Sequence, residues 1–142
     1  MLKAEIILVE DNLSDADLII RALKKSNLVN NLVHLMDGQE AIDYVFGDAE
    51  IKILTPPRLI LLDLKMPKVS GLEVLERLKM DERTKAIPVV ILTSSKEEPD
   101  LQRCYELSVN SYVVKPVVFD DFIKAIAQIG LYWLLVNEPV KK

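Results

Sequence analysis

The sequence is short of the residues on which several large classes of protein depend. Its single cysteine, Cys104, cannot form an intramolecular disulfide, and with only 1 histidine in the chain no Cys/His cluster can hold zinc. Glycine occurs 4 times in 142 residues, and no Walker-type phosphate-binding loop is present. The apolar run 129–136 is too short to span a membrane, and Lys3 and Glu5 interrupt the N-terminus too soon for a signal peptide. We therefore expect a cytoplasmic protein that does not cross a membrane.

The chain also lacks a strong charge of either sign. Its formal net charge is −4, and lysine and arginine are scattered along it, so we expect no nucleic-acid partner. Hydrophobic residues make up 50% of the sequence, which argues against disorder. A chain of 142 residues is long enough to bury one core. Residues 1–142 are accordingly predicted to form a single domain.

What the sequence does contain is a series of short apolar runs separated by segments with helical spacing. The runs are rich in aliphatic residues, and they cover 6–9, 32–36, 59–62, 88–92 and 112–114. Short runs that are apolar on both faces are typical of buried parallel strands. The segments between them, and a last helix predicted from about 120 to 136, carry apolar residues at helical intervals. This alternation predicts an α/β fold with a parallel sheet and helices on both faces.

Polar residues follow four of the predicted strands at the point where each strand ends. They are Glu10-Asp11, Asp63, Thr93-Ser94 and Lys115. The carboxyl ends of parallel strands lie along one edge of a sheet, so these side chains should converge. Three carboxylates and one ammonium leave a net negative cluster made of oxygen ligands, which suits Mg²⁺. The sequence therefore predicts a divalent metal site at this edge.

A metal beside a carboxylate, an ammonium and a hydroxyl is suited to phosphoryl transfer. An aspartate can attack phosphorus and form an aspartyl-phosphate, and positive charges then neutralise the phosphoryl oxygens. An acidic residue after a single strand is more often a helix cap or a loop residue. The agreement of four strand ends favours a site instead, with Asp63 as its reactive carboxylate.

The same residues resemble the receiver domain of two-component response regulators. The resemblance rests on Glu10-Asp11, on Asp63 with Pro67 and Gly71, on Thr93-Ser94, and on the run from Tyr112 to Pro116. It covers about residues 6–131 of the chain. It implies a flavodoxin-like (βα)5 fold whose five parallel strands lie in the order 2-1-3-4-5.

The resemblance also implies a role for each residue of the motifs. Asp63 would accept phosphate from a histidine of a sensor kinase, and Lys115 would pair with the carboxylate and then with the phosphate. Mg²⁺ (or Mn²⁺) would be bound by Asp11, by Asp63 and by the backbone carbonyl of Lys65, with Glu10 acting through a metal-bound water. The protein would promote its own phosphorylation and dephosphorylation without being a dedicated enzyme.

The resemblance further implies a conformational switch. Thr93 would move to bond the phosphoryl group, and Tyr112 would change rotamer with it. The peptide bond between Lys115 and Pro116 would be cis. Lys65 follows Asp63 by two, at a position whose side chain lies near the phosphoryl group in the family, so its charge would also influence how long the phosphate survives.

The output is expected to be a protein contact, because no DNA-binding or enzymatic domain follows in this chain. The last helix carries a second apolar stripe that includes Ile129, Tyr132 and Val136, and this stripe predicts a partner surface. Receivers commonly form homodimers through the segments that correspond here to the helix with 101–107, the strand 112–114 and the last helix. The extended end of that helix also resembles stand-alone regulators paired with phytochrome-type histidine kinases. The sequence does not specify the downstream protein partner.

Three other classes of protein share part of this pattern. Phosphatases of the haloacid dehalogenase type need a second aspartate two residues after the nucleophile, where this chain has Lys65. A flavodoxin-like FMN protein needs a phosphate-binding loop after the first strand, and Glu10-Asp11 would repel that phosphate. A phosphorylation-independent scaffold or dimerisation module with a receiver fold remains the alternative, although such a module would normally have lost Asp63, Thr93 or Lys115.

Overall fold

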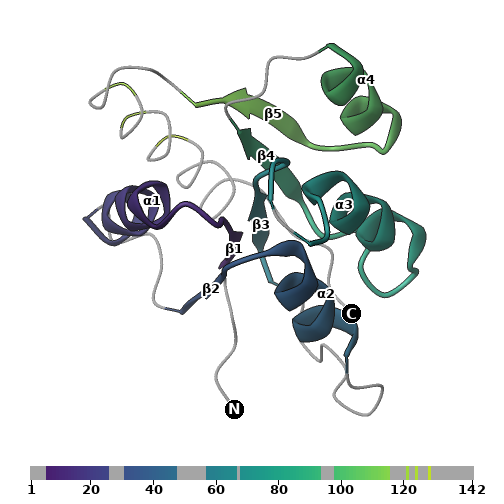
Figure 1. Ribbon diagram of the computed structural model, residues 1–142, viewed down its shortest axis with the longest axis horizontal. Coiled ribbons are helices and arrows are strands. Elements are labelled where there is room, and N and C mark those ends of the chain that lie inside the picture. Colours follow the sequence, from purple (N-terminus) through teal and green to yellow (C-terminus); the bar gives the residue numbers. More distant parts are fainter. Residues whose placement is uncertain are drawn as a thin grey trace.

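The computed structural model describes residues 6–25, 31–47, 57–66, 68–93 and 98–115, together with 121, 124 and 128 (Figure 1). Five parallel strands form one sheet in the order β2-β1-β3-β4-β5. The strands are β1 (Ile6–Val9), β2 (Leu32–Leu35), β3 (Leu59–Leu62), β4 (Val89–Thr93) and β5 (Ser111–Val114). The helices are α1 (Leu13–Lys25), α2 (Gly38–Phe46), α3 (Gly71–Met80) and α4 (Glu98–Glu106). The predicted α/β fold and its strand order are confirmed.

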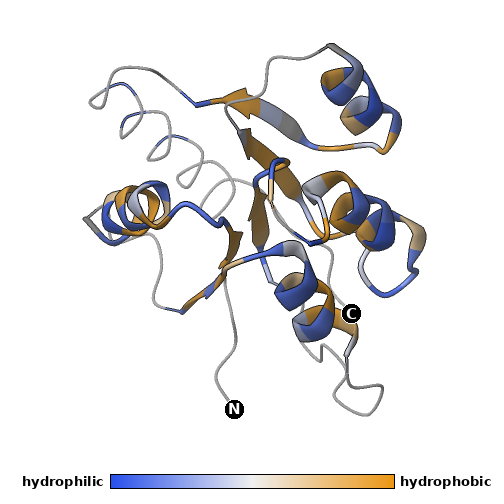
Figure 2. Cartoon of the chain, in the orientation of Figure 1, coloured by the Kyte–Doolittle hydropathy of each residue, from blue (hydrophilic) through white to orange (hydrophobic). Residues whose placement is uncertain are grey.

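The centre of the sheet is buried on both faces because β1 and β3 carry aliphatic residues at every position and β4 does so up to Leu92. In β1 the side chains of Ile6 and Leu8 belong to one core cluster, whereas those of Ile7 and Val9 belong to another. This alternation follows from the two-residue period of a strand. The hydropathy colouring shows β1, β3 and β4 as largely apolar strands between helices with mixed surfaces (Figure 2).

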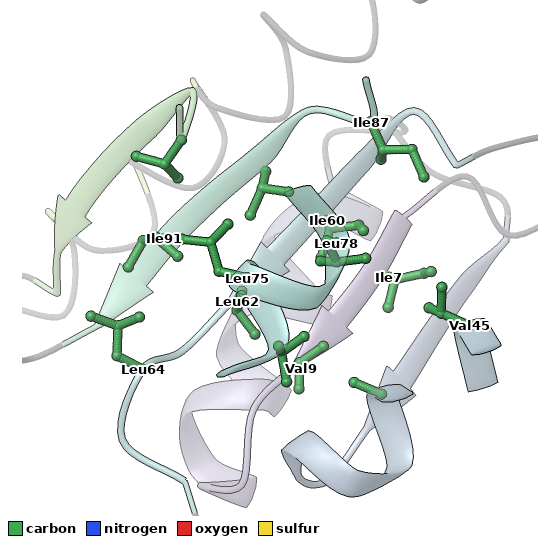
Figure 3. Close-up of a cluster of buried hydrophobic side chains, with 14 of the residues drawn as sticks. Ile7, Val9, Val45, Ile60, Leu62, Leu64, Leu75, Leu78, Ile87 and Ile91 are labelled. Carbon is green, nitrogen blue, oxygen red and sulfur yellow. The ribbon is translucent and has the colours of Figure 1, made fainter. Parts of the chain in front are cut away.

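The two clusters place helices on opposite faces of the sheet. On one face, Ala16, Ile19 and Leu23 of α1 pack against the strands. On the other, residues of α2, α3 and α4, among them Val45, Leu75 and Cys104, complete the larger cluster. Figure 1 shows α1 on the opposite side of the sheet from α2 and α3. Figure 3 shows how Val45, Leu75 and Leu78 converge with strand residues such as Ile60 and Leu62.

The ends of three strands, β2, β4 and β5, differ by one residue from the prediction, and the difference in β4 bears on the site. β4 runs from Val89 to Thr93, one residue later than predicted, so Thr93 lies inside the strand and not after it. Pro88 has no N–H to donate, although its carbonyl accepts a hydrogen bond from Ile60 N at 2.9 Å. Thr93 continues the ladder because its carbonyl accepts from Lys115 N at 2.7 Å. β2 lies at an edge of the sheet, as predicted, and ends at Leu35.

Several residues for which the sequence made predictions lie outside the described part of the chain. This applies to Pro67, Ser94 and Pro116, and with Pro116 to the predicted cis peptide bond. It also applies to Ile129, Tyr132 and Val136 of the predicted partner surface. Within the last predicted helix, Asp121, Lys124 and Gln128 are helical and exposed.

Among the helices that the structure describes, none combines the length and the apolar character needed to cross a membrane.

Candidate functional site

The register of β1 and β3 places the two most buried carboxylates of the site side by side. Val9 is aligned with Leu62, so Glu10 and Asp63 each follow the last residue of adjacent strands. The ladder extends one residue further, because Asp63 N donates to Val9 O at 3.1 Å and Glu10 N donates to Leu35 O at 3.0 Å. Both residues are therefore held by backbone bonds to the rigid sheet, and their side chains start from fixed positions.

Three carboxylates meet at this edge, as the sequence predicted. One oxygen from each of Glu10, Asp11 and Asp63 can be chosen so that all three lie within 4.8 Å of one another. Glu10 is 1% exposed and Asp63 is 6% exposed, whereas Asp11 is half-buried. Oxygen ligands at this spacing, partly open to solvent through Asp11, are the donor set that a hard divalent cation such as Mg²⁺ or Mn²⁺ prefers. These residues fit a divalent metal.

Lys115 completes the site from the end of β5. Its Nζ donates hydrogen bonds to Glu10 Oε1 at 2.7 Å, to Asp15 Oδ2 at 2.7 Å and to Asp63 Oδ2 at 3.4 Å. The predicted contact between Lys115 and Asp63 is present, but it is the longest of the three. The ammonium therefore bridges the carboxyl ends of β1 and β3 and the first turn of α1.

Burial and charge shift the pKa values of this cluster. Burial raises the pKa of Glu10 above its usual range, and the hydrogen bond from Lys115 only partly offsets that rise. Burial alone would lower the pKa of Lys115, but the hydrogen bonds to Asp15 and Glu10 and the charge of Asp63 outweigh it and raise the pKa. Lys115 is thus fixed as a cation, and Glu10 readily holds a proton when no metal is bound.

Asp15 was not predicted as a site residue. It lies in the first turn of α1. The structure assigns the cap to Asn12, whose Oδ1 accepts from Asp15 N at 3.0 Å and whose own N donates to Glu10 Oε2 at 3.2 Å.

His34 contacts the site through the backbone of Glu10. Its Nε2 lies 2.8 Å from the main-chain oxygen of Glu10. The side chain comes from β2, the strand next to β1. His34 therefore ties the edge strand to the residue at which the acidic cluster begins.

The loop after Asp63 folds back tightly toward α3. Gly71 N donates to Leu64 O at 3.0 Å, and a Cβ on Gly71 would collide with the main-chain oxygen of Asp63. Only glycine fits this close approach. Lys65 N lies 3.3 Å from Asp63 Oδ1, and the Lys65 ammonium lies 3.7 Å from Asp100 Oδ2 of α4. The loop that carries Asp63 is thus connected to two helices.

The predicted switch residues lie on β4, the neighbour of β3, and on β5, the neighbour of β4. Thr93 is fully buried at the end of β4, and Tyr112 is half-buried on β5 against the larger core cluster. Thr93 is aligned with Val114, so it lies one residue before Lys115 in the register. Thr93 therefore lies at the strand end next to the site, and Tyr112, aligned with Ile91, lies on the neighbouring strand.

With this fold and this cluster, the chain belongs to the response regulator receiver domain family of two-component signalling: the family's model matches residues 6–127. A curated relative from Methanothrix harundinacea, named "Probable methanogenesis regulatory protein FilR2", is 45% identical over 130 residues, which are 91% of this chain and 83% of that protein. The response regulator Rcp1 of Synechocystis is 40% identical over 129 residues, 91% of this chain and 88% of that one.

Solved structures agree with the sequence comparison. A crystal structure of the Mn²⁺-bound form of response regulator Rcp1 matches with a TM-score of 0.88 and 38% identity, covering 96% of this chain and 98% of that one. The phosphorylated cyanobacterial phytochrome response regulator RcpA matches with a TM-score of 0.89 and 37% identity, covering 99% of this chain and 100% of that one. Relatives that are this similar over nearly their whole length support the proposals that follow.

Proposed function

We propose that Asp63 is the phosphoacceptor of a two-component phosphorelay and receives its phosphate from a histidine of a sensor kinase. The observation that carries this proposal is the convergence of Glu10, Asp11 and Asp63 within 4.8 Å, beside a lysine whose Nζ lies 3.4 Å from Asp63 Oδ2. A buried carboxylate with an ammonium and a metal-binding set beside it is what an aspartyl-phosphate requires. The phosphorylated relative RcpA supports the same chemistry.

In the proposed reaction an Asp63 carboxylate oxygen attacks the phosphorus of phosphohistidine or of a small acyl phosphate. A new P–O bond forms, and the bond from phosphorus to the leaving nitrogen or oxygen breaks, its electron pair departing with the leaving group. Lys115 neutralises charge on the phosphoryl oxygens. Loss of the phosphate follows when water attacks the phosphorus and the Asp63 carboxylate leaves. The protein thereby promotes its own phosphorylation and dephosphorylation.

We assign the divalent metal to Asp11, Asp63 and the backbone carbonyl of Lys65, with Glu10 acting through a metal-bound water. Bound Mg²⁺ or Mn²⁺ would add positive charge where the phosphoryl oxygens accumulate negative charge. The close grouping of the three carboxylates supports this assignment. The Mn²⁺-bound form of Rcp1 supports it from a relative.

The signal would leave the site through Thr93 and Tyr112. Thr93 would move to bond the phosphoryl group, and the Tyr112 ring would change rotamer into the space this opens. The cis bond before Pro116 belongs to the same proposal. The position of Thr93 at the end of β4, next to β3, and of Tyr112 on the adjacent strand β5 supports it.

We further propose that residues 1–142 act as one cytoplasmic domain that signals by protein contact. A homodimer would use α4, β5 and the last helix, with Ile129, Tyr132 and Val136 in its interface. The kinase would be of the phytochrome type, which the name of the relative RcpA supports. Light scattering with and without the phosphate analogue beryllofluoride tests the dimer: a monomer at high micromolar concentration in both states rejects it.

The central experiment is phosphorylation by acetyl phosphate with Mg²⁺, followed by intact mass spectrometry. Wild type should gain one phosphate, and Asp63→Asn should gain none. Asp43→Asn is the matched control, because Asp43 is exposed on α2. If Asp63→Asn gained phosphate as readily as wild type, Asp63 would not be the phosphoacceptor. Absence of any Mg²⁺-dependent labelling of wild type would favour the phosphorylation-independent scaffold.

A further inference from the structure

We propose that Asp15 is a positioning residue that restrains the Lys115 ammonium and limits how closely it can approach a phosphoryl group on Asp63. The inference rests on the proposed phosphorylation of Asp63. Asp15 lies outside the acidic triad of Glu10, Asp11 and Asp63, and it is not one of the residues that touch the reacting atoms. Removing the charge of Asp15 should therefore make phosphorylation easier.

The contacts of Lys115 show a preference among its carboxylate partners. Its Nζ is 2.7 Å from Asp15 Oδ2 and 2.7 Å from Glu10 Oε1, but 3.4 Å from Asp63 Oδ2. The Lys115 side chain is 11% exposed and that of Asp15 is 30% exposed, so solvent screens their pairing only in part. The ammonium is drawn toward the start of α1 and away from the residue that is phosphorylated.

The donors of Lys115 are fully used in this arrangement. An ammonium has three N–H groups, and the structure gives one to each of Glu10, Asp15 and Asp63. A phosphoryl group on Asp63 adds oxygens and negative charge beyond the carboxylate. To bond them closely, Lys115 must lengthen or give up one of its two short contacts. Glu10 belongs to the metal-binding group, whereas Asp15 does not, so the contact with Asp15 is the one available to change.

A purely structural role for Asp15 leaves this geometry unexplained. An acidic residue in the first turn of α1 stabilises the helix by its position alone, without an ammonium partner. Asp17, two residues further on, shows the ordinary case: its carboxylate is exposed and pairs with Arg21 at 3.0 Å on the helix surface. Asp15 instead reaches a lysine 100 residues away in the sequence. Its charge acts on the site.

The test compares Asp15→Asn with Asp17→Asn, which removes the same charge from the same helix but from outside the site. Both variants and wild type are labelled with acetyl phosphate in saturating Mg²⁺. Asp15→Asn should be labelled about threefold to tenfold faster, the range expected for loss of one partly buried charge pair. It should also bind beryllofluoride more tightly by a similar factor. Asp17→Asn should match wild type.

A double mutant separates the effect on Lys115 from a general change of charge. In a Lys115→Gln background, adding Asp15→Asn should have no further effect on the rate of labelling. The proposal is overturned if Asp15→Asn is no faster than Asp17→Asn, or if its gain persists without Lys115. Circular dichroism checks the fold, and Asp15→Ser gives a second variant should Asp15→Asn not fold.

A measurement that needs no phosphorylation keeps the two proposals distinguishable. The side-chain ammonium of Lys115 can be followed by ¹⁵N NMR, because hydrogen bonds to three carboxylates slow the exchange of its protons with water. In Asp15→Asn that exchange should be faster, whereas in Asp17→Asn it should not change. If wild type accepts no phosphate, the proposed function fails, and an unchanged ammonium signal in Asp15→Asn separately rejects the positioning role.

Discussion

The Nε2 atom of His34 lies 2.8 Å from the main-chain oxygen of Glu10. A carbonyl oxygen only accepts hydrogen bonds, so Nε2 carries the proton and donates it. The bond joins the edge strand β2 to Glu10, the first residue of the acidic cluster. It supports the position of Glu10 without adding charge to the carboxylates.

Replacing His34 by leucine should destabilise the protein by about 1 kcal/mol, the typical net contribution of one hydrogen bond. Urea unfolding followed by circular dichroism measures the change in the free energy of unfolding. His34→Gln is the matched variant, because its amide nitrogen can donate to the same carbonyl and should restore most of the loss. Equal destabilisation by leucine and glutamine would show that side-chain shape, and not the donated bond, is what matters.

Gly71→Ala should disturb both stability and the site. The added Cβ would overlap the main-chain oxygen of Asp63 and lie 2.6 Å from Leu64 Cα. Backbone cannot yield as a flexible side chain does, so we expect a loss of about 1–3 kcal/mol, as for other overpacked positions. Denaturant unfolding measures it, and slower labelling of Asp63 should accompany it.

Ser70→Ala provides the comparison for Gly71. Ser70 caps α3, where its Oγ accepts from Glu73 N at 3.3 Å, so its loss weakens the start of the same helix without a collision. Ser70→Ala should lower stability but leave the labelling rate of Asp63 close to wild type. If the two variants slow labelling equally, the collision of Gly71 with Asp63 is not the cause.

The sheet and the acidic triad could be predicted because both depend on local pattern. Aliphatic runs such as 59–62 mark buried strands, and a parallel sheet brings their polar ends together wherever they lie in the chain. The roles of Asp15 and His34 could not be predicted in this way. Each depends on side chains from different elements that meet only in the folded protein, Asp15 with Lys115 and His34 with Glu10.

The end of β4 was predicted one residue too early for a related reason. Threonine is both a good strand residue and a common loop residue, so its type does not fix its place. The hydrogen bond that keeps Thr93 in the ladder comes from Lys115 N, on a strand much later in the chain. Pro88 marks the other end, since a proline cannot donate to the ladder.

Acid should weaken the turn after α3 through Asp81. Hydrogen bonds from the side chain and backbone of Arg83 lower the pKa of Asp81 to about 2. A carboxylate whose pKa is lower in the folded state stabilises the fold above its unfolded pKa of about 3.9, and the stabilisation is lost as the pH falls toward about 2. Asp81→Asn should therefore be less stable than wild type at pH 6 and should lose less stability in acid.

Thermal unfolding between pH 6 and pH 2 measures this difference. Glu82→Gln is the control, because Glu82 is the exposed neighbour and its side chain is 84% exposed. Parallel pH curves for wild type and Asp81→Asn would contradict the role given to Asp81.

Cys104 should be unreactive in the folded protein. Its side chain is fully buried in α4, and burial, with a smaller effect of Asp100, raises the pKa of the thiol to about 11. Alkylation requires the thiolate and access to it. Iodoacetamide at pH 8 should modify the native protein far more slowly than the urea-unfolded protein, as intact mass shows over time. Similar rates in both states would mean that α4 opens readily.

Glu10 should make the stability of the metal-free protein depend on pH. Burial raises its pKa from 4.5 to about 8, so the folded state holds a proton that the unfolded state releases. A carboxyl group with a raised pKa favours the fold at low pH, and this advantage is lost as the pH rises from about 4.5 to about 8. Without metal, the unfolding temperature should therefore fall across that range.

Mg²⁺ should oppose this fall, because metal binding needs ionised carboxylates and becomes stronger as Glu10 loses its proton. The stabilisation by Mg²⁺ should accordingly increase between pH 5 and pH 8, and chelation should remove it. Glu10→Gln cannot titrate, so its metal-free curve should be flatter than that of wild type. Glu73→Gln, which changes an exposed residue of α3, should keep the wild-type slope. Differential scanning fluorimetry with Mg²⁺ or with a chelator measures all three proteins, and a wild-type slope in Glu10→Gln would assign the pH dependence to another group.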